Sequence, residues 1–85
     1  MARLSRDEIR SIVIDCVSEI APEADFDALK PERPWREQLE IDSFDFQNLL
    51  AAIETRAGVT VPEMDYAKLA LFDEMLDYLE ARQAA

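Results

Sequence analysis

Apolar residues recur at every helical turn over residues 9–20, and this spacing places six side chains on one face of a single helix. Ser5 and Glu8 stand just before the stripe with the spacing of a capping box, in which each side chain accepts a hydrogen bond from the other residue's backbone N–H. Pro22 follows the stripe and cannot continue a helix. We therefore predict a helix over residues 6–21. Its buried face is expected to consist of Ile9, Ile12, Val13, Cys16, Val17 and Ile20.

A second helical pattern begins after Asp42, whose side chain can cap the free N–H groups of the first turn. Asp45 complements the positive end of the helix dipole. Gly58 stands where a left-handed C-terminal cap is usual. These signals predict a helix over residues 43–57. Its inward face is expected to consist of Phe46, Leu49, Leu50 and Ile53, with the small Ala52 and Ala57.

Two shorter helical segments are expected in the last third of the sequence. Asp65 can cap a short third helix over residues 66–69, and a fourth helix begins near Asp73 and ends near Arg82. The stretch 59–62 is extended, but its proline and the lack of a partner strand argue against a sheet. The apolar side of the fourth helix is expected to consist of Phe72, Met75, Leu76 and Leu79.

The helical period is lost between residues 22 and 41, where three prolines remove backbone donors. A loop of this length in a small domain is usually functional or packed by its own side chains. A short helical turn is expected over residues 34–39, because Pro34 suits the first helical position. The apolar anchors of the loop are Phe26, Leu29, Trp35 and Leu39. The chain is thus predicted to be all-α, a small four-helix bundle with a long first loop and a short third helix.

The composition excludes several classes of protein. The 85 residues, 49% of them hydrophobic, suffice for a single domain over residues 1–85 but not for a large buried active site. No apolar run approaches the ~20 residues that cross a bilayer, and residues 1–8 lack the apolar stretch of a signal peptide. We therefore expect a cytoplasmic protein without stable membrane insertion.

The chain also lacks the residues of common catalytic centres. It contains no histidine, and the lone Cys16 falls on an apolar stripe, where a buried structural thiol is the favoured interpretation. Metal binding and Cys/His catalysis are therefore not expected. The formal charge of −10 repels nucleic acid and favours basic protein surfaces, although solubility alone is the simpler interpretation of the charge.

Ser43 stands at the expected start of the helix over residues 43–57. Asp42 already serves as the cap, so the Ser43 hydroxyl is free for another role, although serine is also common at helix starts for capping alone. A phosphodiester there would place negative charge beside unpaired N–H groups and the positive end of the helix dipole. The hydroxyl has no histidine or lysine beside it in the sequence, so another enzyme would have to modify it.

The motif Asp42-Ser43-Phe44-Asp45 resembles the Asp-Ser-Leu-Asp signature of acyl carrier proteins. The resemblance extends over roughly residues 4–82, through Leu39-x-Ile41 before the motif, Gly58-Val59-x-Val61-Pro62 after the helix, and Leu76-Asp77-Tyr78-Leu79 near the end. It implies a monomeric carrier, not an enzyme, with 4′-phosphopantetheine attached to Ser43 by a phosphopantetheinyl transferase. The arm's thiol would hold acyl intermediates as thioesters for enzymes of fatty-acid, lipid or polyketide-type pathways.

The chain departs from the family pattern in two places. Glu40 replaces the glycine of the common signature, and Phe44 replaces its leucine. The helix after the signature carries neutral or basic residues where a typical carrier has acids, namely Gln47, Asn48, Thr55 and Arg56. The residues expected to meet basic docking surfaces on acyl-loading and acyl-transferring partner enzymes are Asp42, Phe44, Asp45 and Glu54. These departures indicate a specialised carrier, with neutral surface drift as the alternative.

Several alternatives remain open from the sequence. Phe44 is a partner contact or a core wedge, with a shared role favoured. The cargo is either acyl or, in a small biosynthetic pathway, aminoacyl or peptidyl. An unmodified helical adaptor is the alternative from a different class. An acyl chain could also lie between the helices, but a stripe of large apolar residues is more often plain core. The residues of that stripe are Phe46, Leu50, Ile53, Leu69, Leu71 and Phe72.

Overall fold

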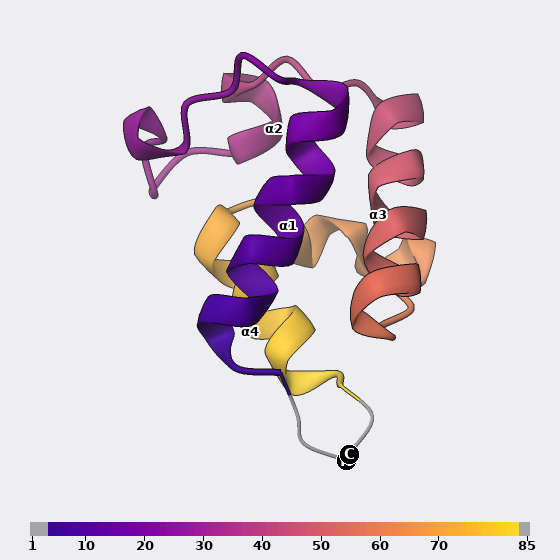
Figure 1. Ribbon diagram of the computed structural model, residues 1–85. Coiled ribbons are helices and arrows are strands. Elements are labelled where there is room, and N and C mark those ends of the chain that lie inside the picture. The colour runs from indigo at the N-terminus through magenta and orange to yellow at the C-terminus, as the bar shows by residue number, and fades with distance from the viewer. Residues whose placement is uncertain (1–3, 84–85) are drawn as a thin grey trace.

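The computed structural model describes residues 4–83, and its regular elements are all helices within that range. In chain order they are α1 (Arg6–Ile20), η1 (Phe26–Ala28), α2 (Trp35–Gln38), α3 (Ser43–Ala57), η2 (Glu63–Leu69) and α4 (Phe72–Ala81). Figure 1 shows α1 and α3 side by side, with the segment between them folded across one end of the pair. α4 packs against α1 and η2. The predicted all-α fold is confirmed, with a long first connection and a short third helix.

The capping signals fix where the two long helices begin. The Ser5 hydroxyl accepts the Glu8 backbone N–H at 3.2 Å, and the Glu8 carboxylate accepts the Ser5 N–H at 3.0 Å, so the predicted capping box is present. Asp42 caps α3 by accepting the Asp45 N–H at 2.8 Å. Gly58 ends α3 with φ +72°, a left-handed conformation that glycine adopts without steric cost.

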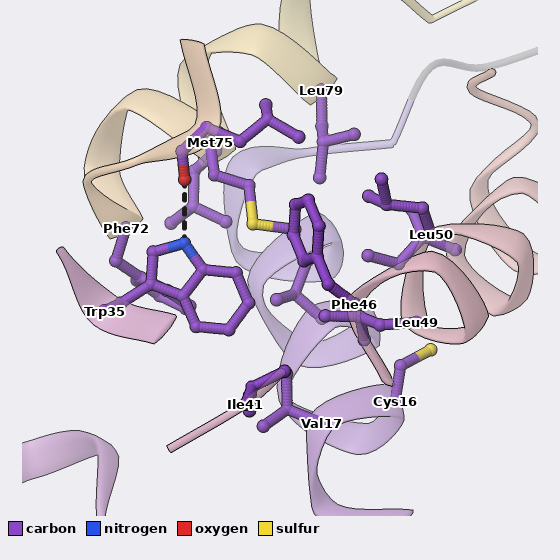
Figure 2. Packing of buried hydrophobic residues seen from close by; sticks show 14 of the residues in the cluster. Cys16, Val17, Trp35, Ile41, Phe46, Leu49, Leu50, Phe72, Met75 and Leu79 are labelled. Carbon is purple, nitrogen blue, oxygen red and sulfur yellow. Dashed lines mark hydrogen bonds between the residues drawn. The ribbon is translucent and has the colours of Figure 1, made fainter. Parts of the chain in front are cut away.

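The long loop is tied to the bundle by Trp35, whose side chain is fully buried. Its indole N–H donates to the Leu69 carbonyl oxygen at 2.8 Å, and its ring lies against Phe46 and Phe72 in the core that Figure 2 shows. The predicted anchors at Phe26, Leu29 and Leu39 are partly buried against the same core. Trp35 therefore fastens α2 to the end of η2 and packs against Phe46 of α3.

The prediction that Asp65 caps the third helix is wrong. η2 begins at Glu63, three residues before the predicted start, and Asp65 lies inside it with a buried side chain. Its carboxylate accepts a hydrogen bond from the Tyr78 hydroxyl at 2.6 Å and also meets Arg82 at 3.3 Å and Lys68 at 3.4 Å. The aspartate thus joins η2 to α4, because the two cations and the phenol offset the cost of burying a charge.

A loss of stability at acid pH is expected from Asp65. The hydrogen bond from Tyr78 holds its pKa below the ordinary value, desolvation opposes this, and Lys68 and Arg82 lower the pKa further. The contribution of Asp65 to stability is therefore complete above the ordinary aspartate pKa, about 3.9, and is lost as pH falls through the lower folded pKa. We expect the free energy of unfolding of Asp65→Asn, measured in urea at several pH values, to depend less steeply on acid pH than that of the wild type.

The exposed Asp15 on α1 provides the matched control, because Asp15→Asn makes the same chemical change away from any ion pair of the described residues. It should retain the acid dependence of the wild type. Equal acid dependence in the wild type and in Asp65→Asn would contradict the role of this carboxylate.

Candidate functional site

Ser43 is the first residue of α3, and its side chain is exposed. Asp42 supplies the cap, as predicted, and within residues 4–83 the Ser43 hydroxyl makes no hydrogen bond. The backbone N–H groups of Ser43 and Phe44 also lack an acceptor in this part of the chain, as expected for the first turn of a helix. The hydroxyl is therefore accessible, unengaged and next to free backbone donors.

This environment fits a phosphodiester on the hydroxyl oxygen. The free N–H groups and the positive end of the α3 dipole favour an anion at this point, whereas the carboxylates of Asp42 and Asp45 oppose it. The chain has no histidine to act as a base, and no ion pair or hydrogen bond brings a cation to Ser43 among the described residues. The site can thus hold a phosphate ester, but the residues around it cannot activate the serine.

Glu40 lies just before the site in a strained backbone conformation, with φ +56°. This is the left-handed region, which costs a residue with a side chain roughly 1–2 kcal/mol. Glu40 lines two cavities, one shared with residues of α2 and η2 and the other with residues 21–29 of the long loop. Glutamate at this position therefore lowers stability locally, three residues before Ser43 in the sequence.

The replacement Glu40→Gly is expected to raise the free energy of unfolding by about 1 kcal/mol, because glycine adopts a positive φ without the steric cost. Urea denaturation measures the change. Glu37→Gly removes the same side chain from α2, where the backbone is helical, and should lower the free energy of unfolding by roughly 0.5–1 kcal/mol. A loss of stability in both variants would show that φ at Glu40 is not strained.

A cavity of about 550 Å³ lies beside the start of α3. One wall comes from α2 and the connection to α3, including Arg36, Ile41 and Asp42, and the other comes from η2, including Tyr66 and Leu69. Asp42, which directly precedes Ser43 in the sequence, is thus part of the cavity wall, whereas Ser43 is not. The sequence predicted neither the cavity nor the place of Arg36, since both depend on how α2 meets η2.

The four residues expected to recognise partners do not lie together. Asp42, Phe44 and Asp45 share the first turn of α3 and its cap, whereas Glu54 is in the last turn, about 14 Å further along the axis at 1.5 Å per residue. The Phe44 side chain is 72% exposed, so the core part of its expected shared role is wrong and a surface role remains. The sequence missed Met64 on η2, which is 86% exposed and is the other large apolar side chain described as exposed.

Most of the remaining sequence candidates belong to the core, whereas Leu69 also lines the cavity beside α3 and Leu71 is only half-buried. Cys16 is buried in α1, and burial raises the pKa of its thiol, which agrees with a structural role. Phe46, Leu50 and Ile53 are buried against the other helices and line neither of the two cavities. No helix among residues 4–83 is both long and apolar enough to span a membrane, and the same residues contain no group of acidic, cysteine or histidine side chains that could hold a metal ion.

The sequence was also compared with known protein families and with curated proteins. The family profile described as "Phosphopantetheine attachment site" matches residues 11–79. A curated acyl carrier protein of Rubrobacter xylanophilus is 29% identical over 79 residues, which cover 89% of this chain and 98% of that protein. That of Thermosynechococcus vestitus is 30% identical over 79 residues, covering 93% of this chain and 91% of that protein. That of Campylobacter lari is 30% identical over 77 residues, which cover 91% of this chain and 94% of that protein.

Proposed function

Because the chain belongs to the acyl carrier protein family, whose cofactor is 4′-phosphopantetheine, we propose that Ser43 is the residue to which this arm is attached. The observation that supports this best is the exposed Ser43 hydroxyl, free of hydrogen bonds among the described residues, on the first residue of α3. The other serines of the sequence, Ser5, Ser11 and Ser18, belong to α1 or its cap. Ser5 is engaged in the capping box and lies outside the matched range.

The chain acts as a carrier and not as a catalyst. When bound, the arm supplies a thiol that holds an acyl group as a thioester. Asp42 caps the start of α3, the free N–H groups of Ser43 and Phe44 would favour the negative charge of the phosphate, and Trp35 anchors the segment before them. Since the sequence has no histidine, and no lysine beside Ser43, we expect a phosphopantetheinyl transferase to activate the hydroxyl.

We propose a stand-alone carrier, acting as one domain, that delivers acyl groups to enzymes of a fatty-acid, lipid or polyketide-type pathway. Partner enzymes with basic surfaces would be attracted by the net charge of −10. Asp42 and Asp45 then lie close to the attachment residue, and the exposed Phe44 offers an apolar contact between them. Glu54 would contact a partner only if the docking surface extends along α3.

The test is intact-protein mass spectrometry after incubation with coenzyme A, Mg²⁺ and a broad-specificity phosphopantetheinyl transferase. We expect a mass gain of one phosphopantetheinyl group, located on Ser43 by fragmentation of the peptide that contains it. A gain located on any other serine would overturn the assignment. No gain with either this transferase or one from the same cell would favour an unmodified adaptor.

A further inference from the structure

Glu40 occupies the position at which the end of α2 requires a left-handed residue. The Ile41 backbone N–H donates to the Arg36 carbonyl oxygen at 3.0 Å, and the Glu40 N–H donates to the Glu37 carbonyl oxygen at 3.4 Å. This pair of hydrogen bonds is a Schellman motif, in which the residue after the C-cap has a positive φ and is usually glycine. The end of α2 therefore sets the φ of +56° at Glu40, and glycine would suit the fold better.

Nothing in the described part of the chain offsets the cost of a side chain at this position. Glu40 is exposed, and its carboxylate takes part in no ion pair or hydrogen bond among residues 4–83. In contrast, the carboxylates of Glu8, Glu19 and Asp65 each have a partner within the fold. Residues held in strained backbone conformations cluster at functional sites. The Glu40 side chain is therefore suited to a contact outside the chain.

The place of Glu40 in the fold limits which partner this contact involves. Glu40 stands three residues before Ser43, in the connection that Figure 1 shows crossing the end of the bundle where α3 begins. A phosphopantetheinyl transferase acts on the Ser43 hydroxyl itself, so it has to contact the surface around this serine. Enzymes that act on the cargo reach the thiol at the far end of the arm instead. The transferase is thus the partner that most needs the residues beside Ser43.

The charges beside Ser43 indicate what the transferase presents at this point. Asp42 and Asp45 flank the serine closely in the sequence, and Glu40 adds a third carboxylate. Three negative charges favour a cation on the partner surface. Asp42 is committed to the cap of α3 and Asp45 is half-buried, which leaves Glu40 as the exposed carboxylate without an engagement.

We propose that Glu40 determines recognition by the phosphopantetheinyl transferase of the same cell, and that its carboxylate binds an arginine or lysine of that enzyme. The proposal rests on the attachment of the arm to Ser43. Such a contact forms when the two proteins associate and persists during the transfer, so its loss raises KM and leaves kcat unchanged. Because the contact lies at the surface, salt weakens it.

The test measures KM and kcat of that transferase by intact-protein mass spectrometry, with coenzyme A and Mg²⁺ in excess and the carrier concentration varied. Glu40→Gln keeps the length of the side chain and removes its charge, whereas Glu40→Gly also removes the backbone strain. We expect both variants to raise KM roughly fivefold at low ionic strength, with kcat unchanged. At about 1 M salt the Debye length falls to about 3 Å, and the difference in KM should disappear. Urea denaturation should show Glu40→Gly to be more stable than the wild type, so unfolding cannot explain its higher KM.

Glu32→Gln is the matched control, because Glu32 is exposed, lines neither of the two cavities and forms no ion pair among residues 4–83. It makes the same change in net charge and should leave KM unchanged. An unchanged KM in Glu40→Gln would overturn the proposal, even with Glu40→Gly impaired, since the enzyme would then recognise the backbone and not the carboxylate. An equal rise in KM in Glu32→Gln would also overturn it.

A failure of the proposed attachment gives a different result. A wild-type protein that gains no arm with this transferase or with the broad-specificity one would refute attachment to Ser43, and the role of Glu40 with it. The mass spectrum separates that outcome from a changed KM, because the arm is then missing from every variant.

Discussion

Replacing Ser43 with alanine is expected to abolish loading by the phosphopantetheinyl transferase completely, because alanine has no oxygen to form the phosphate ester. The fold should be nearly unaffected. Ser43 is exposed, the cap of α3 comes from Asp42, and no hydrogen bond of the described residues involves the Ser43 hydroxyl. Exposed substitutions of this kind usually change the free energy of unfolding by no more than about 0.5 kcal/mol. Intact mass and urea denaturation measure the two effects on one sample.

Ser18→Ala is the control for this experiment, since Ser18 is exposed in the last turn of α1 and its loss should leave loading unchanged. The comparison of Ser43→Ala with Ser18→Ala separates loss of the attachment oxygen from a general effect of removing a serine. A Ser43→Ala protein that still gains the mass would contradict the assignment. A variant that unfolds would contradict the conclusion that Asp42 alone caps α3.

The helix ends that could be predicted from the sequence are those set by neighbouring residues. The Ser5–Glu8 capping box and the Asp42 cap need only a few consecutive residues, and Gly58 supplies its own positive φ. Such local signals placed α3 at the predicted residues and α1 within one residue of its end. Ser43 as the candidate site followed from them, because a helix start defines which hydroxyl is left free.

The features that the sequence did not reveal depend on contacts between distant segments. Aspartate is a common helix cap, so local signals favoured that role for Asp65. Its actual partner is Tyr78, thirteen residues away, and local propensity cannot anticipate a contact at that separation. In the same way, nothing in the sequence around Arg36 indicates a contact with the core. Only the packing of α2 against η2 places it on Phe46 and leaves its Nε without an acceptor.

The largest loss of stability is expected from Trp35→Ala. Trp35 is fully buried, and its truncation removes the contacts with Phe46 and Phe72 and leaves the Leu69 carbonyl oxygen without its donor. Large-to-small changes of this kind cost about 3–5 kcal/mol. A small domain has a total stability of roughly 5–15 kcal/mol, so the variant should be close to unfolding. Urea denaturation followed by far-ultraviolet circular dichroism measures the loss without relying on tryptophan fluorescence.

Phe44→Ala serves as the matched control, because it truncates an aromatic side chain that is 72% exposed and should change the free energy of unfolding by no more than about 0.5 kcal/mol. Trp35→Phe keeps most of the ring and removes the indole N–H, so it should fall between the two. Equal stability of Trp35→Ala and Phe44→Ala would show that α2 is not fastened to η2. The expected order of the losses in free energy of unfolding is Trp35→Ala, then Trp35→Phe, then Phe44→Ala. The packing of Trp35 therefore supports the segment that leads to the start of α3, since Trp35 immediately precedes Arg36, Glu40 and the cap of α3.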